Sequence, residues 1–156
     1  MSAILIRPFA SGNQTAVRAL VLAGLKDHFG ELDPTLNRDL DDIALSYVAQ
    51  GGIVIVAERD AVIVGTGALI PAEPGVSRLV RMSVACEARG QGLGKQLVRR
   101  LIELARARGD HRVLVETNDD WLDAIARYRS CGFGDERHED GDIHLVLNLI
   151  LCQTPI

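Results

Sequence analysis

The stretch Arg89-Gly90-Gln91-Gly92-Leu93-Gly94-Lys95 is the most informative part of this sequence of 156 residues, because it predicts a glycine-rich turn between a strand and a helix. The apolar run 79–84 before it predicts a β-strand, and 96–108 after it carries apolar residues at helical spacing. A glycine-rich turn between a strand and a helix leaves several N–H groups unpaired at the positive end of the helix dipole. Because glycine has no Cβ, a bulky anion can approach these amides closely. The stretch therefore predicts an anion site suited to a pyrophosphate, although glycines at a helix start can also form only a tight turn.

The turn differs from two familiar nucleotide loops. It matches neither the dinucleotide pattern G-x-G-x-x-G nor the P-loop G-x-x-x-x-G-K-[ST]. Instead Arg89, Gly92 and Gly94 meet the pattern [Q/R]-x-x-G-x-[G/A], and in this form the turn resembles the acyl-CoA pyrophosphate loop of the GCN5-related N-acetyltransferases (the GNAT family). Three further stretches carry the same resemblance: Arg81-Met82-Ser83-Val84, Leu114-Val115-Glu116-Thr117 and Ala124-x-x-x-Tyr128-x-x-x-Gly132-Phe133.

Length, charge and composition set the class of protein. A chain of 156 residues fits one domain, 1–156, and its net charge of −4 argues against a nucleic-acid partner. The longest apolar runs fall far short of the ~20 residues that span a bilayer, and residues 1–10 lack the features of a secretory signal. We therefore expect a cytoplasmic protein that does not cross a membrane.

No metal is expected. The three cysteines, Cys86, Cys131 and Cys152, are widely spaced and include no C-x-x-C, so neither a disulfide framework nor a zinc site is indicated. The consecutive residues His138, Glu139 and Asp140 cannot all turn toward one ion without a tight loop to arrange them.

Periodicity and turn residues predict the element order β-α-α-β-β-β-α-β-α-β-β. This is the order of the acetyltransferase fold, an α/β (α+β) mixed sheet with helices on both faces, which the resemblance implies. Ser11 and Gln14 resemble a capping box that starts the first helix, and Arg59-Asp60 reads as a hairpin turn. The expected strands are 3–7, 53–58, 61–70, 76–84, 113–117 and 143–151, the helices 11–28, 40–48, 96–108 and 121–130, and 135–142 an acidic hairpin loop.

The resemblance implies acetyl-CoA as co-substrate. Its pyrophosphate would lie on the loop, and its pantetheine arm would add to the fourth strand where the fourth and fifth strands splay apart. In relatives, an asparagine stands seven residues before the tyrosine that corresponds to Tyr128. Here that residue is Trp121, and Asn118 is the nearest substitute. The implied coenzyme contacts are Met82, Ser83, Val84, Arg89, Gly90, Gln91, Gly92, Leu93, Gly94, Lys95 and Asn118.

Two residues are the catalytic candidates. Tyr128 stands where similar enzymes carry a tyrosine, whose hydroxyl could protonate the departing sulfur, although a core tyrosine is the plainer alternative. Many relatives use a carboxylate of the fourth strand as base, but 76–84 contains no acid, so Glu116 on the fifth strand is the next candidate. Glu73 and His28 remain open as alternatives.

The predicted activity is acetyl transfer from acetyl-CoA to a primary amine of a small molecule or peptide, by direct attack in a ternary complex. Acceptor specificity in the family comes mainly from the segments that correspond to 27–37 and 135–144, whose acids suit a cationic amine. A non-catalytic acyl-CoA sensor is the alternative, and a nucleotide-binding domain is a weaker third. The apolar run 149–151 is compatible with a homodimer edge.

Overall fold

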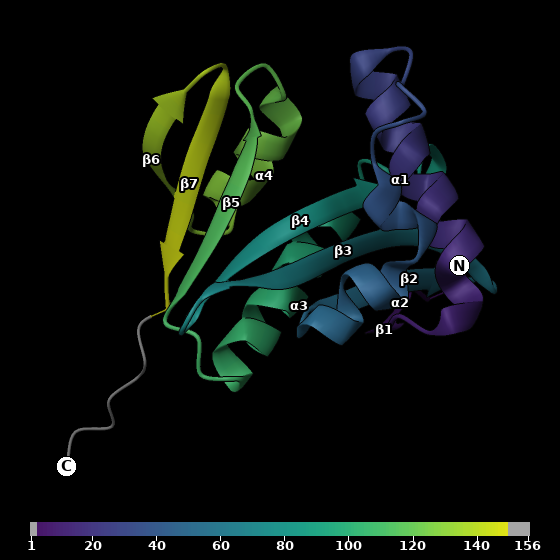
Figure 1. The fold of residues 1–156 in the computed structure, drawn as a ribbon, viewed down its shortest axis with the longest axis horizontal. Coiled ribbons are helices and arrows are strands. Elements are labelled where there is room, and N and C mark those ends of the chain that lie inside the picture. Colours follow the sequence, from purple (N-terminus) through teal and green to yellow (C-terminus); the bar gives the residue numbers. More distant parts are fainter. Residues whose placement is uncertain (1–2, 150–156) are drawn as a thin grey trace.

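A computed structural model of the chain describes residues 3–149 (Figure 1). Seven strands form one sheet in the order β1-β2-β3-β4-β5-β7-β6. Neighbouring strands are antiparallel except β4 and β5, which run parallel. The mixed α/β sheet predicted from the sequence is confirmed. The strands are β1 (Leu5–Pro8), β2 (Ile53–Arg59), β3 (Val62–Glu73), β4 (Val76–Val84), β5 (Arg112–Asn118), β6 (Gly134–Glu139) and β7 (Asp142–Asn148).

Helices pack against both faces of the sheet. We call the side of α1 and α2 the front face and the side of α3 and α4 the back face (Figure 1). The back core is built around α3, where Leu93, Leu97, Leu101 and Ala105 recur at every fourth position and are at most 1% exposed. Each fully buried leucine contributes about 2 kcal/mol. The helices are α1 (Gln14–Phe29), α2 (Ile43–Ser46), α3 (Leu93–Ala107) and α4 (Leu122–Ser130).

Strands β4 and β5 pair along only part of their length. Their register runs from Val76 opposite Arg112 to Leu79 opposite Val115 and then stops. Beyond Leu79, the register of β4 against β3 also shifts, and Arg81 takes a φ of 56°. A bulge of this kind bends a strand and turns it away from its neighbour. The edge of β4 that follows the bulge is therefore free on its β5 side.

The side chain of Arg81 holds the bulge against the segment between α1 and α2. Its guanidinium donates to both carboxylate oxygens of Asp39, at 2.7 and 3.0 Å, and to Oδ1 of Asn37 at 3.1 Å. The Tyr47 hydroxyl also donates to Asp39. Partial burial alone would raise the pKa of Asp39, but the hydrogen bonds from Arg81 and Tyr47 outweigh it and hold that pKa below its usual range.

Three predictions for the first half of the chain were wrong in detail. The expected capping box does not form, because Gln14 instead donates to Leu40 O at 2.7 Å and accepts from Ile43 N at 2.9 Å. The predicted helix 40–48 is one α-helical turn, α2, between two 3-10 turns. The β2–β3 turn is one residue later than predicted, since Asp60 and Ala61 are the residues with positive φ.

Two further boundaries also differ from prediction. Residues 135–142 are not a hairpin loop: β6 occupies most of them, and the turn to β7 is only Asp140-Gly141. Helix α3 begins at Leu93, inside the glycine-rich stretch rather than after it. The predicted dimer edge 149–151 lies almost wholly outside the described residues.

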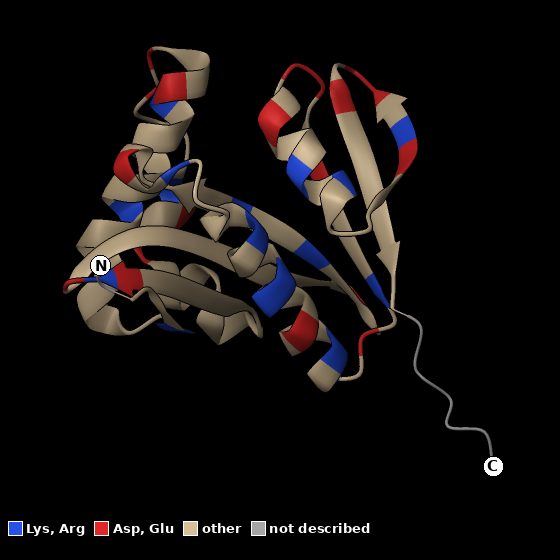
Figure 2. Cartoon of the chain, turned by 180° about the vertical axis from the view of Figure 1, so that it is seen from behind, with Lys and Arg blue, Asp and Glu red and all other residues tan. Residues whose placement is uncertain are grey.

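Basic and acidic residues are both distributed over the chain, with several basic ones along α3 (Figure 2). None of the helices in residues 3–149 combines the length and the apolar character needed to cross a membrane.

We predict that Asp39→Asn lowers the free energy of unfolding by about 1.5–3 kcal/mol at pH 7, because it removes a charge-assisted pair. The folded-state pKa of Asp39 lies below its unfolded value of 3.8. Its stabilising contribution is therefore complete above that value and is lost as the pH falls through the folded pKa. Urea unfolding at a series of pH values measures this, and an equal difference between variant and wild type at pH 7 and pH 2 would contradict the assignment.

Candidate functional site

The glycine-rich turn has the predicted geometry of an anion site. Gly90 and Gly92 take φ values of 76° and 79°, which L side chains rarely adopt. The first helical hydrogen bond runs from Gln96 N to Gly92 O, at 3.1 Å. The amides of residues 90–95, which precede Gln96, donate no backbone hydrogen bond to any described residue. They are left at the N-terminus of a helix of 15 residues, where the helix dipole favours a negative charge.

A cavity of about 450 Å³ opens over this turn. Arg127 of α4 reaches across it: a Cβ built on Gly94 would stand 2.4 Å from Arg127 Nε. A side chain at residue 94 would therefore displace the guanidinium of Arg127 from its place over the turn. Arg127 was not predicted, because a basic residue in a helix gives no sign of the turn it will pack against. The cavity is lined by Val84, Ala88, Arg89, Gly90, Gly92, Leu93, Gly94, Lys95, Asp123, Ala126, Arg127 and Ser130.

Two of the predicted loop residues use their side chains to hold the turn. Arg89 donates from Nε to Val84 O at 3.1 Å and from Nη2 to Asp27 at 3.2 Å. Gln91 accepts from Arg59 Nη1 at 3.3 Å. Their backbones remain available to a ligand. The loop is thus tied to the end of β4, to α1 and to β2.

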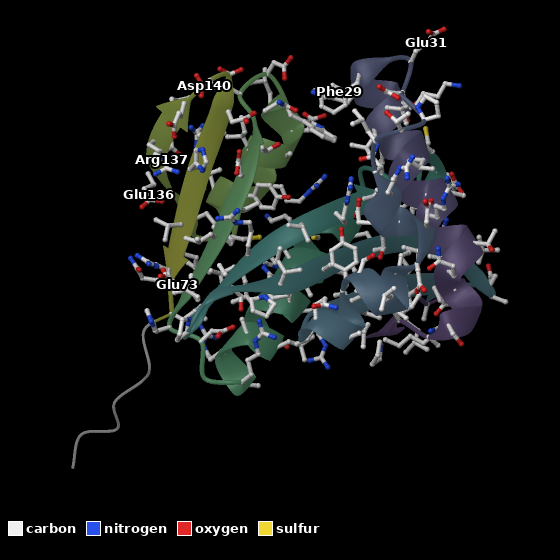
Figure 3. All side chains as sticks on the ribbon, viewed as in Figure 1. Phe29, Glu31, Glu73, Glu136, Arg137 and Asp140 are labelled. Atoms are coloured by element: carbon white, nitrogen blue, oxygen red, sulfur yellow. The ribbon has the colours of Figure 1, made fainter. Side chains whose placement is uncertain are left out.

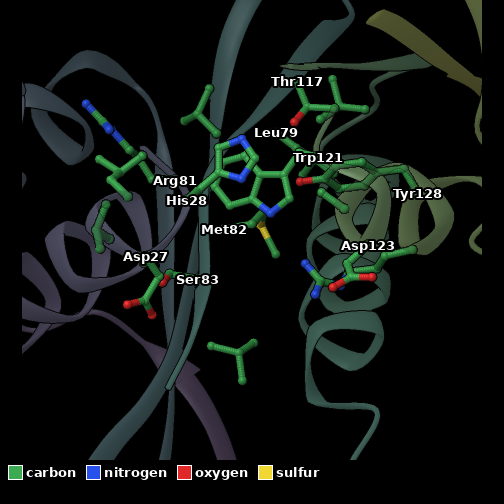
Figure 4. A pocket seen from close by; sticks show the side chains of 18 of the residues that line it. Asp27, His28, Leu79, Arg81, Met82, Ser83, Thr117, Trp121, Asp123 and Tyr128 are labelled. Carbon is green, nitrogen blue, oxygen red and sulfur yellow. The ribbon is translucent and has the colours of Figure 1, made fainter. Parts of the chain in front are cut away.

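A second cavity, of about 340 Å³, lies where β4 and β5 diverge (Figure 4). It shares Val84, Arg89, Asp123 and Arg127 with the loop cavity, so the two form one groove. Its walls come from α1, β4, β5 and α4. The groove therefore leads from the glycine loop on the back face, between the strands, to the front face.

The predicted residues of β4 line this groove with unequal roles. Met82, Ser83 and Val84 are all in its wall. The Ser83 hydroxyl donates to Leu20 O of α1 at 3.2 Å, so only the backbone of Ser83 is free for a ligand. Asn118, by contrast, lines neither of these two cavities, and its amide donates to Asp142 Oδ1 at 2.9 Å. We do not include Asn118 in the site.

Tyr128 projects from α4 into the groove. Its ring is 5% exposed and packs edge-on against Phe133, with 5.8 Å between centroids. Figure 4 shows its hydroxyl directed toward Trp121 and the open space, and it makes no hydrogen bond to any described residue. Burial raises the pKa of Tyr128 to about 12. The phenol is thus a protonated donor without a protein acceptor.

An aromatic stack bridges two walls of the groove. The His28 ring lies parallel to Trp121, with 4.1 Å between centroids and an interplanar angle of 8°. His28 Nε2 is 3.3 Å from Asp120, and Phe29 meets the indole edge-on. Trp121, which replaces the asparagine of relatives, therefore joins α4 to α1. His28 is accordingly part of a stack across the groove as well as an alternative base.

Glu116 lies where the groove opens to the front face. It lines both the groove and a small front-face cavity, and its Oε2 is 3.9 Å from Nδ1 of His144. Glu73, the other acidic alternative, is paired with Arg112 at 3.1 Å and lines none of the three cavities. Figure 3 shows Glu73 at the far end of the sheet from Phe29. Of the two acids, only Glu116 is near the divergence of the strands.

Within residues 3–149, no group of three or more His, Cys, Asp or Glu side chains converges.

A sheet opened between β4 and β5, with an amide-lined turn at one end of the opening, has room for an elongated anion between its strands. The family model described as Acetyltransferase (GNAT) family matches residues 19–133. This match spans most of the chain, so the chain belongs to the GNAT family. The family and the fold predicted from the sequence are confirmed.

Individual relatives and solved structures agree with this family assignment. N-acetyltransferase 8B of Homo sapiens is 36% identical over 108 residues, 65% of this chain and 48% of that protein. The chain spans about half the length of the mammalian relatives it matches. A GNAT acetyltransferase of Staphylococcus aureus Mu50 has the same fold, with a TM-score of 0.86, 24% identity and coverage of 94% of this chain and 99% of that one. The PaiA N-acetyltransferase of Thermoplasma acidophilum, solved with coenzyme A, has a TM-score of 0.82 and 15% identity, and the match covers 94% of this chain and 99% of that one.

Trp121 is the single tryptophan of the chain, so its fluorescence reports on the groove alone. We predict that His28→Ala increases the emission, because the stacked imidazole quenches the indole. His138→Ala, which changes an exposed histidine of β6, is the matched control and is expected to leave the spectrum unchanged. Equal spectra for His28→Ala and wild type would mean that the stack does not form in solution.

Proposed function

We propose that this chain is an acetyl-CoA-dependent N-acetyltransferase that transfers the acetyl group to a primary amine by direct attack in a ternary complex. One observation carries the proposal: the unpaired amides of residues 90–95, the free edge of β4 and the Tyr128 hydroxyl all open into one groove. These three features provide, in order along the groove, a place for an anion, a place for an extended chain and a proton donor.

The donor would be held by the back-face half of the groove. The amides of the turn, with Arg89 and Arg127 beside them, suit a pyrophosphate, because amides at a helix N-terminus and guanidinium groups both favour phosphate. Beyond Leu79, the β4 backbone has no partner on its β5 side, so an amide-bearing pantetheine arm can pair there as an added strand. The backbone N–H near Val84 would then face the thioester oxygen and stabilise the oxyanion.

Tyr128 would assist the leaving group chiefly by donating a hydrogen bond. In the reaction the amine nitrogen bonds to the carbonyl carbon, and the carbon–sulfur bond breaks to release a thiolate. A phenol of pKa about 12 is protonated at neutral pH. Complete proton transfer to a thiolate of ordinary thiol pKa, about 8.5, would cost about 5 kcal/mol. A charge-assisted hydrogen bond stabilises the thiolate without that cost.

Glu116 would accept the proton of the amine, directly or through a water. An amine of pKa about 10.4 is mostly protonated at pH 7, and supplying its free base costs about 4.6 kcal/mol. Glu116 lies at the front-face opening of the groove, opposite the entry of the donor. An acceptor arriving from the front face would therefore meet the base before it reaches the thioester.

We predict that Gly92→Glu raises the Kd for coenzyme A at least tenfold. The substitution forces a side chain into a left-handed conformation, which costs about 1–2 kcal/mol, and places a carboxylate at the anion site. Gly12→Glu adds the same charge at an unstrained position with open space around it and is expected to bind normally. Titration calorimetry measures both, and unchanged affinity for Gly92→Glu would exclude the turn as the pyrophosphate site.

We predict that wild type releases free thiol from acetyl-CoA with at least one acceptor of a panel of amino acids, polyamines, aminoglycosides and peptides. Tyr128→Phe should lower kcat by roughly 10²-fold or more while leaving the KM for acetyl-CoA nearly unchanged, since the hydroxyl acts on the transition state. Tight coenzyme binding without turnover on any acceptor would favour the sensor function instead. A Tyr128→Phe enzyme as active as wild type would remove the tyrosine from the mechanism.

A further inference from the structure

A small hollow of about 160 Å³ lies on the front face of the sheet, beside the mouth of the groove. It is formed by β4, β5, β6 and β7, and helices α1 and α2 lie over the other half of the sheet (Figure 1). Figure 3 shows Glu136 and Arg137 on β6 at the edge of this face. Its charged lining comprises Arg78, Arg112, Glu116, Glu136, Arg137 and His144.

The strand registers explain why these side chains gather. Arg78 of β4 stands level with Leu114 of β5, and Glu116 of β5 stands level with His144 of β7, which pairs with Arg137 of β6. Residues that stand level in neighbouring strands project from the same face of a sheet. The spacing of two residues from Leu114 to Glu116 keeps both side chains on that face. The strand register therefore brings these side chains together on one face of the sheet.

The arginines of the hollow have donors to spare. The Nε atoms of Arg78 and Arg112 are buried and have no hydrogen-bond partner among the described residues. Arg112 is paired through Nη2 with Glu73, at 3.1 Å, and Arg137 with Glu139, at 3.3 Å. Arg78 makes no ion pair with any residue between 3 and 149. Buried N–H groups of a guanidinium normally find an acceptor, and a carboxylate fits their fork geometry.

The hollow and the proposed base are adjacent. Val115 and Glu116 line both the hollow and the groove. Along β5, Glu116 is two residues, or about 6.6 Å, from the level of Arg78. A molecule with a positive and a negative end separated by a few bonds can thus place its amine at Glu116 and its anionic end at Arg78. A long polyamine has no charge to match the arginines.

We propose that this hollow binds the carboxylate of the acceptor, so that the acceptor is an amino carboxylate, that is, an amino acid or a small derivative with a free carboxylate. This inference rests on the proposed acetyltransferase function. It narrows the acceptor class and departs from the cationic amine that the acidic loops suggested. Asp135 of that hairpin is already paired with Arg129 at 2.6 Å.

The test compares acceptors that differ only in the carboxylate: an amino acid, its primary amide and its decarboxylated amine, followed by thiol release. Wild type should prefer the amino acid by about tenfold or more in kcat/KM, the effect of one charge-assisted contact. Arg78→Gln should abolish the preference through KM, and Arg78→Lys should restore part of it. Arg18→Gln, which removes an exposed arginine of α1 outside all three cavities, should keep the full preference.

A second measurement does not depend on turnover. Calorimetry compares the N-acetylated amino acid with its amide, in the presence of coenzyme A, on wild type and on Arg78→Gln. Tighter binding of the carboxylate form that is lost in Arg78→Gln supports the hollow even if no acceptor turns over, an outcome that overturns only the acetyltransferase function. Equal binding of acid and amide to wild type, or a preference that survives in Arg78→Gln, overturns the hollow as a carboxylate site. Should Arg78→Gln fail to fold, Arg78→Lys replaces it: a preference for the carboxylate form that is weaker than in wild type supports the hollow, and one equal to wild type overturns it.

Discussion

The ion pair between Arg81 and Asp39 fixes the point at which β4 leaves β5. An L-residue with positive φ costs about 1–2 kcal/mol, and the structure keeps Arg81 there because its guanidinium gains Asp39 and Asn37 as partners. The bulge ends the pairing of the two strands after Leu79. Without that interruption, β4 and β5 would close the sheet, and the groove between them would not exist.

The interruption also leaves the groove open at two ends, one on each face of the sheet. The glycine turn and Arg127 lie at the back-face end of the groove, whereas Glu116 and the hollow lie at the front-face end. Two substrates that enter from opposite faces do not compete for the same space. This arrangement is compatible with the direct transfer that we propose.

The sequence predicted those features that depend on neighbouring residues. Alternating glycines, an apolar stripe and β-branched runs identified the anion turn, α3 and most strands. Prediction from the sequence failed where contacts between distant residues determine the structure. Helix α2 is a single turn, and the residues that flank it, Asp39 and Tyr47, are hydrogen-bonded to Arg81 and to each other. The predicted order ends in two strands, but the residues of β6 were assigned to a loop, because β6 is an edge strand whose residues are all exposed and show no apolar alternation. Arg127 and the hollow around Arg78 follow from helix packing and strand register, which local patterns do not encode.

The same register explains why the proposed base is on β5 and not on β4. Strand β4 contributes Arg78 to the front face, and Arg81 is committed to Asp39. A carboxylate in β4 beside these arginines would form an ion pair that lowers its basicity and occupies the donors of Arg78. Placed on β5, Glu116 has His144 Nδ1 at 3.9 Å and leaves Arg78 without an ion-pair partner among residues 3–149. The absence of an acid from β4 is thus the condition under which one face of the sheet can present a base and an anion site side by side.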